Sequence, residues 1–194
     1  MRDLEMPIHD PQPALHDLQT LRHEIDAIDD DLLALIERRV AASAKVAALK
    51  NGESPGLLKL RPRREAEVVN RLQQAARRAP PEMVAHLWRT LMSYGLEAQT
   101  PVQLVVHATG NRQALQECVR ARFGPAAALV WSDDAASALA VARDQEAIAI
   151  LDHALALPQD DNLRVFDTIA RPDGLRLYAI GRVAAEDIVD GAGR

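Results

Sequence analysis

The feature that most constrains this chain is a stretch from Leu18 to about Leu49 that contains neither proline nor glycine. Its apolar residues recur at alternating steps of three and four, which is the spacing of one face of an α-helix. The steps join Leu18, Leu21, Ile25, Ile28, Leu32, Leu35, Arg39, Ala42, Val46 and Leu49. Such a seam predicts one long helix that packs on other helices along most of its length.

One position of this seam carries Arg39, where an apolar residue belongs. A buried guanidinium costs several kcal/mol, roughly, unless an anion compensates it. That anion is either an acidic side chain on a facing helix or a ligand inside a helical bundle, and Arg39 alone leaves both open. Lys50 lies about 20° around the helix from Arg39 and about 16 Å along it, so both cations could hold one small anion.

Two further helices are expected, and each points a polar group at a core. One fits Arg63 to about Arg78, with Pro62 near its first turn, and the other fits Pro81 to about Gln99. Glu65 shares an apolar stripe with Val68, Val69, Leu72 and Ala76. Gln99 continues the stripe of Val84, Trp88, Leu91 and Gly95. Together with Arg39 and Lys50, these two residues predict a polar site inside the helical bundle.

Arg22 lies beside the seam, 17 residues before Arg39. This separation is about 25 Å along a helix, so Arg22 cannot share a small ligand with Lys50 of the same subunit. It is therefore either an ordinary surface residue or a residue that a partner chain contributes. The first helix is also too long for the two shorter ones to cover, which favours an intertwined homodimer.

After Pro101 the pattern changes to alternating strands and helices. Strands are expected at 102–108, 126–131, 147–153, 163–170 and 175–183, and helices at 111–124 and 133–144, the latter with an aspartate N-cap. This order predicts an α/β layer with a parallel core. The predicted fold class is α + α/β, with a disordered tip at 1–14, a helical domain at 15–100 and a small α/β domain at 101–190.

Composition excludes several classes of protein. The net charge is -5, and residues 1–100 and 101–194 each hold fewer basic than acidic residues, so no nucleic-acid partner is expected. We expect neither a signal peptide at residues 1–16 nor a membrane-spanning segment, since the sequence contains no apolar run of the length that a span requires. The single cysteine, Cys118, indicates a reducing compartment, and we expect a cytoplasmic protein in which Cys118 is a buried small hydrophobe. No metal-ligand spacing is present, and His107 and His153 are expected to be structural.

The charged and amide residues of the first half match a known family. LRHEIDAIDDDLLALIERR (21–39), KVAALK (45–50), RREAEVVNRL (63–72) and LWRTLMSYGLEAQ (87–99) resemble the all-helical class of chorismate mutases. The resemblance covers roughly residues 15–100. It implies three helices per chain, an intertwined homodimer with two equivalent sites, and the isomerase reaction that converts chorismate to prephenate, at the branch point of phenylalanine and tyrosine biosynthesis.

The resemblance also implies a role for each site residue. Arg22 would bind a substrate carboxylate in the partner's site, and Arg39 would bind one in its own subunit. Lys50 would contact a carboxylate and the ether oxygen, and Gln99 would donate to the same oxygen. Glu65 would accept the ring hydroxyl, with Arg64 supporting the site beside it. The reaction is a unimolecular rearrangement that needs no cofactor. The charged side chains would hold the substrate in its reactive conformer, and the hydrogen-bond donors would stabilise the negative charge that grows on the ether oxygen.

Two departures from the family pattern leave alternatives open. Arg61 stands where the family commonly has an acid, and Gly95 stands where it commonly has a hydroxyl residue. The alternatives are an isochorismate pyruvate-lyase on the same fold and a ligand-sensing helical dimer without turnover. Arg61 and Arg63 are expected at the rim of the site or in solvent.

The second half faintly resembles part of a prephenate dehydratase lobe. It lacks that enzyme's Thr-Arg-Phe motif, so we expect a degenerate regulatory or stabilising domain there.

Overall fold

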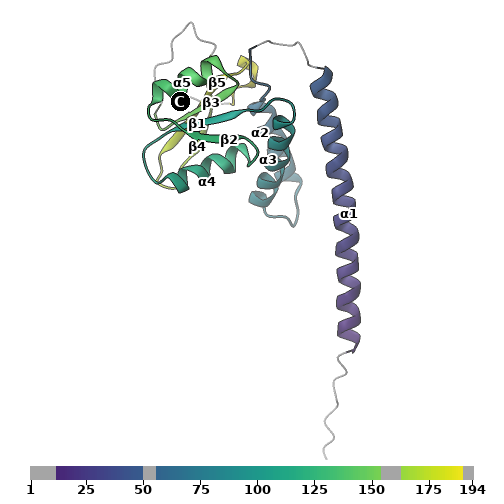
Figure 1. Cartoon of the computed structure of the whole chain (residues 1–194). Coiled ribbons are helices and arrows are strands. Elements are labelled where there is room, and N and C mark those ends of the chain that lie inside the picture. The colour runs from purple at the N-terminus through teal and green to yellow at the C-terminus, as the bar shows by residue number, and fades with distance from the viewer. Residues whose placement is uncertain (1–11, 50–55, 154–162, 190–194) are drawn as a thin grey trace, which may run out of the picture. The chain divides into compact units, whose positions relative to one another are not determined.

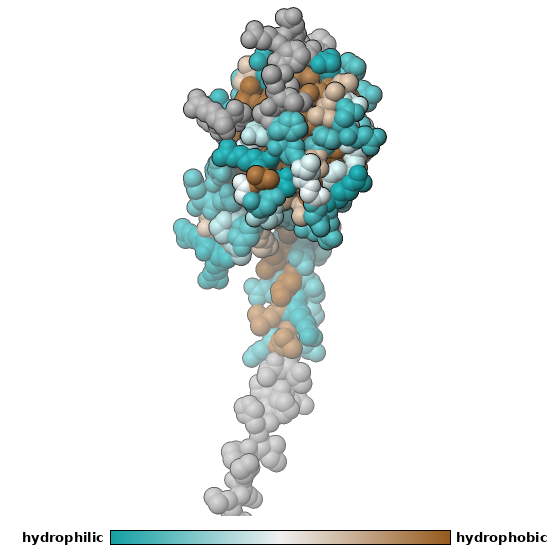
Figure 2. Space-filling model, turned by 90° about the vertical axis from the view of Figure 1, so that its left-hand side faces the viewer, coloured by the Kyte–Doolittle hydropathy of each residue, from teal (hydrophilic) through white to brown (hydrophobic). Residues whose placement is uncertain are grey.

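The computed structural model describes residues 12–49, 56–153 and 163–189, and it divides the chain into two units, Met1–Ser43 and Ala44–Arg194. The predicted long helix is confirmed as α1, Gln12–Leu49, which begins within the segment expected to be a disordered tip. The large apolar side chains of its seam are 44–84% exposed in the single chain. Figure 2 shows them as an apolar row between hydrophilic side chains. The seam therefore has the pattern of a helix-packing face.

The second unit begins with a helical hairpin. Helix α2 spans Pro62–Ala75 and helix α3 spans Pro81–Glu97, and the two pack on each other. Both start with proline in the first turn, where the missing N–H has no helical acceptor to lose. Helix α2 ends three residues before the predicted Arg78, and Val69 and Val84 are buried.

A five-stranded mixed sheet follows the hairpin. Its strands are β1 Gln103–His107, β2 Ala128–Trp131, β3 Ala147–Leu151, β4 Leu163–Ala170 and β5 Arg176–Arg182. Their order in the sheet is β2-β1-β3-β5-β4. The first three are parallel, which confirms the predicted parallel core, and β5 pairs antiparallel with both β3 and β4.

Helices α4, Arg112–Phe123, and α5, Ala135–Asp144, lie on opposite faces of this sheet (Figure 1). The alternation of β1 explains the two cores: Leu104 and Val106 pack in the cluster that includes α4, whereas Val105 packs in the cluster that includes α5. Asp134 caps α5 by accepting from the backbone N–H of Ser137 at 2.7 Å, as predicted. None of the described helices is long and apolar enough to cross a membrane.

The hairpin and the α/β layer meet where α4 ends against α3. Gly124 follows α4 with φ of 76°, a conformation that glycine adopts without strain. A β-carbon at Gly124 would overlap the Ser93 side chain of α3. The last turn of α4 therefore lies directly against α3, and this close approach brings the side chains of that turn to the face of the hairpin.

Candidate functional site

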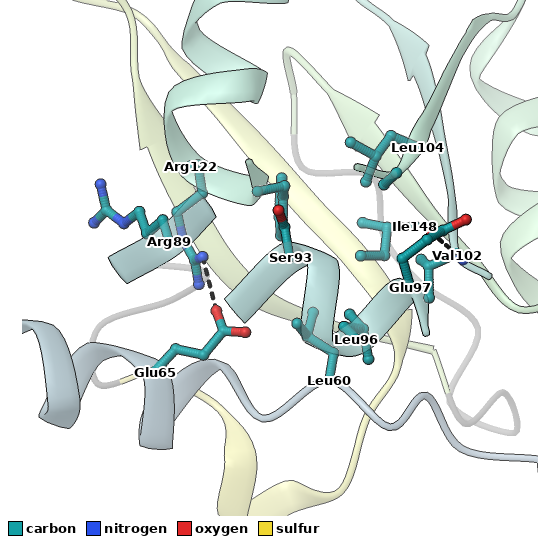
Figure 3. Close-up of a pocket in the computed structure, with 12 residues that line it drawn as sticks. Leu60, Glu65, Arg89, Ser93, Leu96, Glu97, Val102, Leu104, Arg122 and Ile148 are labelled. Carbon is teal, nitrogen blue, oxygen red and sulfur yellow. Dashed lines mark hydrogen bonds and ion pairs between the residues drawn. The ribbon is translucent and has the colours of Figure 1, made fainter. Parts of the chain in front are cut away.

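A buried cluster of charges joins the hairpin to the α/β layer. The Arg122 guanidinium, in the last turn of α4, donates from Nη1 to Glu65 Oε2 of α2 at 3.1 Å and from Nε to Asp167 Oδ2 of β4. The three side chains are 11%, 19% and 10% exposed, respectively. One cation thus links two carboxylates from elements far apart in the sequence. Figure 3 shows Arg122 reaching Glu65 between α4 and α2.

Burial and ion pairing act in opposite directions on these groups. Burial raises the pKa of the Glu65 carboxyl, and the attraction of Arg122 offsets only part of that rise. For Arg122, burial by itself lowers the pKa, but the two carboxylates outweigh it and raise the pKa above its usual range. Arg122 therefore stays charged, and its charge favours the ionised, hydrogen-bond-accepting form of Glu65.

Arg89 of α3 lies beside this cluster (Figure 3). Its Nη1 donates to the Ala121 carbonyl at 3.3 Å, and burial together with the neighbouring Arg122 lowers its pKa. Two small hollows adjoin Glu65 and Arg122 in this unit, with volumes of about 20 and 170 Å³. Both are below the roughly 300–1,000 Å³ of ordinary ligand pockets. A substrate site that contains Glu65 consequently needs more walls than these two hollows provide.

The structure does not bring all the predicted site residues into one described body. Arg22 and Arg39 belong to the first unit and Glu65 to the second, and each unit stands by itself. Arg22 is exposed, whereas Arg39 is half-buried, and burial lowers its pKa. Lys50 lies outside the described residues. The convergence of these groups on one ligand stays a prediction.

The remaining predicted residues lie in the hairpin. Arg64 is exposed and bonds Glu67 at 3.3 Å, pointing away from the buried cluster that holds its neighbour Glu65. Gln99 is partly buried, and its Nε2 donates to the Gly95 carbonyl at 2.8 Å.

The two arginines expected at the rim or in solvent form ion pairs, and both partners are exposed only in the pair of Arg63. Arg61 is paired with Asp187 at 3.8 Å, and Arg63 is paired with Glu67 at 3.7 Å. An exposed pair such as that of Arg63 contributes little to stability. The arginine-rich start of α2 is therefore mostly a solvated helix end, with Glu65 directed inward.

Sequence reasoning missed Arg122 and Asp167. A sequence signal for Arg122 was present, because Arg122 lies at helical spacing from the buried Leu115 and Val119 of α4. It is thus a charged residue at a position on an apolar helix face, as Arg39 is. Asp167 gave no such signal, because a register shift between Val165 and Asp167 breaks the alternation of β4.

The other polar side chains singled out from the sequence have local partners. His107 Nδ1 lies 3.2 Å from the Ser132 carbonyl oxygen, and His153 Nδ1 lies 2.7 Å from Asp152 Oδ1. Cys118 is partly buried against the core cluster of α4. Within the described ranges no group of three or more histidine, cysteine or acidic residues is placed to hold a metal ion.

At the level of class, the chain combines a helical N-terminal region with a mixed five-stranded α/β region, as predicted. Residues 21–100 match the family model of chorismate mutase type II, which confirms the resemblance found in the helical sequence. That family supports chorismate mutase activity, an isomerase activity, for this segment. No curated protein and no solved structure matches the chain.

Proposed function

We propose that the chain is a chorismate mutase that converts chorismate to prephenate in aromatic amino-acid biosynthesis. The observation that carries the proposal is the match of residues 21–100 to the type II family, a segment that holds all of the candidate site residues. The single cysteine favours action in the cytoplasm. The chemistry needs only positioning and electrostatic stabilisation, which charged and amide side chains supply.

The proposed site is assembled by an intertwined homodimer. Its support is the exposed apolar seam of α1, which has the pattern of a helix-packing face. In this assembly Arg39, Lys50, Glu65 and Gln99 come from one chain and Arg22 from its partner. Arginine forks bind the two substrate carboxylates bidentately, and a substrate held this way is restricted to the compact conformer that rearranges.

Glu65 and Gln99 act on the substrate oxygens in this proposal. Glu65 accepts a hydrogen bond from the ring hydroxyl, and the Arg122 charge favours the ionised form that can accept it. Lys50 and Gln99 donate to the ether oxygen as the C–O bond breaks. To do so, Gln99 exchanges its present bond to the Gly95 carbonyl for one to the substrate. Arg64 contributes charge at the rim, where it is exposed.

A second candidate is a helical dimer that binds chorismate without turning it over. The observation that favours this candidate is the hydrogen bond from Arg122 to Glu65 Oε2. Arg122 lies outside the matched segment, and its bond occupies one of the carboxylate oxygens that would accept the substrate hydroxyl. Product analysis on the full chain decides between the possibilities. Formation of prephenate supports the mutase, release of pyruvate would establish the lyase instead, and saturable binding with no product would establish the sensor.

Subunit mixing tests the shared site. Arg22→Ala and Arg39→Ala chains are each expected to be inactive alone. Because each mixed dimer retains one site with both arginines, mixing after subunit exchange is expected to restore part of the activity. Failure to recover activity, with exchange demonstrated by mass labels on the two chains, would refute the contribution of Arg22 from the partner.

A further inference from the structure

A third hollow borders the Glu65 cluster, where α3, the end of α4 and the turn after β4 meet. Its volume is about 480 Å³, within the roughly 300–1,000 Å³ range of small-molecule sites. Three arginines line it, Arg89, Arg122 and Arg171, together with the Thr168 side of β4. We call this hollow the arginine groove.

The acids that pair with these cations are not part of the groove wall. Arg122 is held by Glu65 and Asp167, and Arg171 is held by Asp173 at 2.5 Å. Among the described residues that line the groove none is acidic. The guanidinium groups of Arg122 and Arg171 are thus fixed by carboxylates outside the lining, and Arg89 is held by the Ala121 carbonyl, an arrangement that preorganises donors for an anion.

One of the arginines has a donor without a partner among the described residues. The Arg171 side chain is only 6% exposed, and its Nη1 has no hydrogen-bond partner in the part of the chain that the structure describes. A buried donor without an acceptor is costly and calls for a partner. Arg89 is held beside Arg122, and its pKa is lowered by burial and by that neighbouring charge. An anion in the groove would offset the positive charges that Arg89 and Arg122 place side by side.

The rest of the wall is apolar. The buried Ile169, together with Ala170 and Pro172, lines the groove next to the arginines. A ligand that complements both the arginines and the apolar wall has an anionic group attached to a hydrocarbon body. We propose that the arginine groove is a binding site for a small organic carboxylate, whether or not the chain is a mutase; the groove borders Glu65 through Arg122, but its lining includes no residue of the proposed catalytic site.

Benzoate is a suitable probe, because it joins one carboxylate to one apolar ring. We expect calorimetric titration of the full chain to give saturable binding, and backbone amide signals of Cys118, Thr168 and Ile169 to shift in protein NMR spectra. Benzamide, a neutral analogue of the same shape, is expected to bind at least about tenfold more weakly, as is typical when a charge-assisted hydrogen bond is lost.

Variants locate the site. Arg89→Met and Arg171→Met are each expected to weaken benzoate binding by about tenfold or more. Arg164→Met is the matched control, since Arg164 is an exposed arginine on the same strand as Thr168. Arg39→Met removes a residue of the proposed catalytic site and is expected to leave benzoate binding unchanged.

Several results would overturn the proposal. They are the absence of saturable binding, equal binding of benzamide by the wild-type chain, unaltered affinity in both groove variants, and loss of binding in Arg39→Met. The benzamide comparison uses the wild-type chain, so it stands even where a variant fails to fold. None of these measurements depends on turnover of chorismate. A result that overturns the carboxylate site therefore leaves the proposed mutase function untouched.

Discussion

The buried charge cluster between the hairpin and the α/β layer makes the most demanding prediction, which is the effect of Arg122→Met. This substitution keeps most of the side-chain length but removes the only described cation that bonds both Glu65 and Asp167. Breaking a buried pair by removing one partner costs about 3–5 kcal/mol, because an uncompensated charge is left behind. All three side chains are less than a fifth exposed, so water screens the remaining carboxylates poorly.

We therefore expect Arg122→Met to lower the free energy of unfolding at pH 7 by about 3–5 kcal/mol. For a chain of this size the melting temperature falls by about 2–4 °C per kcal/mol, so a drop of about 10 °C is expected. Denaturant and thermal unfolding at one protein concentration measure both quantities. Burial already raises the pKa of Glu65, and without the attraction of Arg122 it rises further, so the loss is smaller near pH 4, where protonation removes the buried charge, and grows as the pH rises.

Two comparisons isolate the charge effect. Adding Glu65→Gln and Asp167→Asn to Arg122→Met is expected to recover most of the lost stability, since no charge then remains buried. The exposed Arg164→Met is expected to stay within about 0.5 kcal/mol of the wild type. An Arg122→Met variant as stable as Arg164→Met at pH 7 would refute the reasoning.

Two smaller predictions concern local contacts. Asp152 accepts hydrogen bonds from the backbone N–H and the hydroxyl of Thr109. Burial alone would raise the pKa of Asp152, but these bonds and the neighbouring His153 outweigh burial and lower the pKa from 3.8 to about 2. Thr109→Val is expected to lower the free energy of unfolding, measured in urea near pH 6, by about 1 kcal/mol. This difference from the wild type is expected to disappear as the pH falls from about 4 to 2. A difference that does not change with pH would contradict the role given to the Thr109 hydroxyl. Gly124→Ala is expected to destabilise by about 1–3 kcal/mol more than Gly174→Ala, because both glycines have positive φ but only at Gly124 would a β-carbon meet Ser93. Equal effects in thermal unfolding would remove the steric argument.

Local patterns predicted the elements of the fold well. The stretch without proline or glycine predicted α1, the proline positions marked the starts of α2 and α3, and alternating strands and helices predicted the parallel core. The position of β5 between β3 and β4 was not predicted, because strand order depends on contacts between distant segments.

The candidate site was predictable only in part. Glu65 was expected to point inward and does so, because its place on an apolar stripe is a local property of α2. Its bond to Arg122 joins residues 57 positions apart, which no helical or strand period encodes. The groups that the proposed homodimer would bring together depend on a second chain, and a pattern within one sequence indicates only that α1 has an apolar packing face.

The rate of chorismate loss on adding the purified full chain tests the central claim most directly. The comparison is between Arg39→Ala and Arg38→Ala, a neighbouring arginine that is exposed, whereas Arg39 is half-buried. We predict turnover by the wild type, little change in Arg38→Ala, and a loss of about a hundredfold or more in Arg39→Ala, as when a transition-state clamp is removed. No turnover by a well-folded wild-type chain, or equal rates in the two variants, would contradict the account.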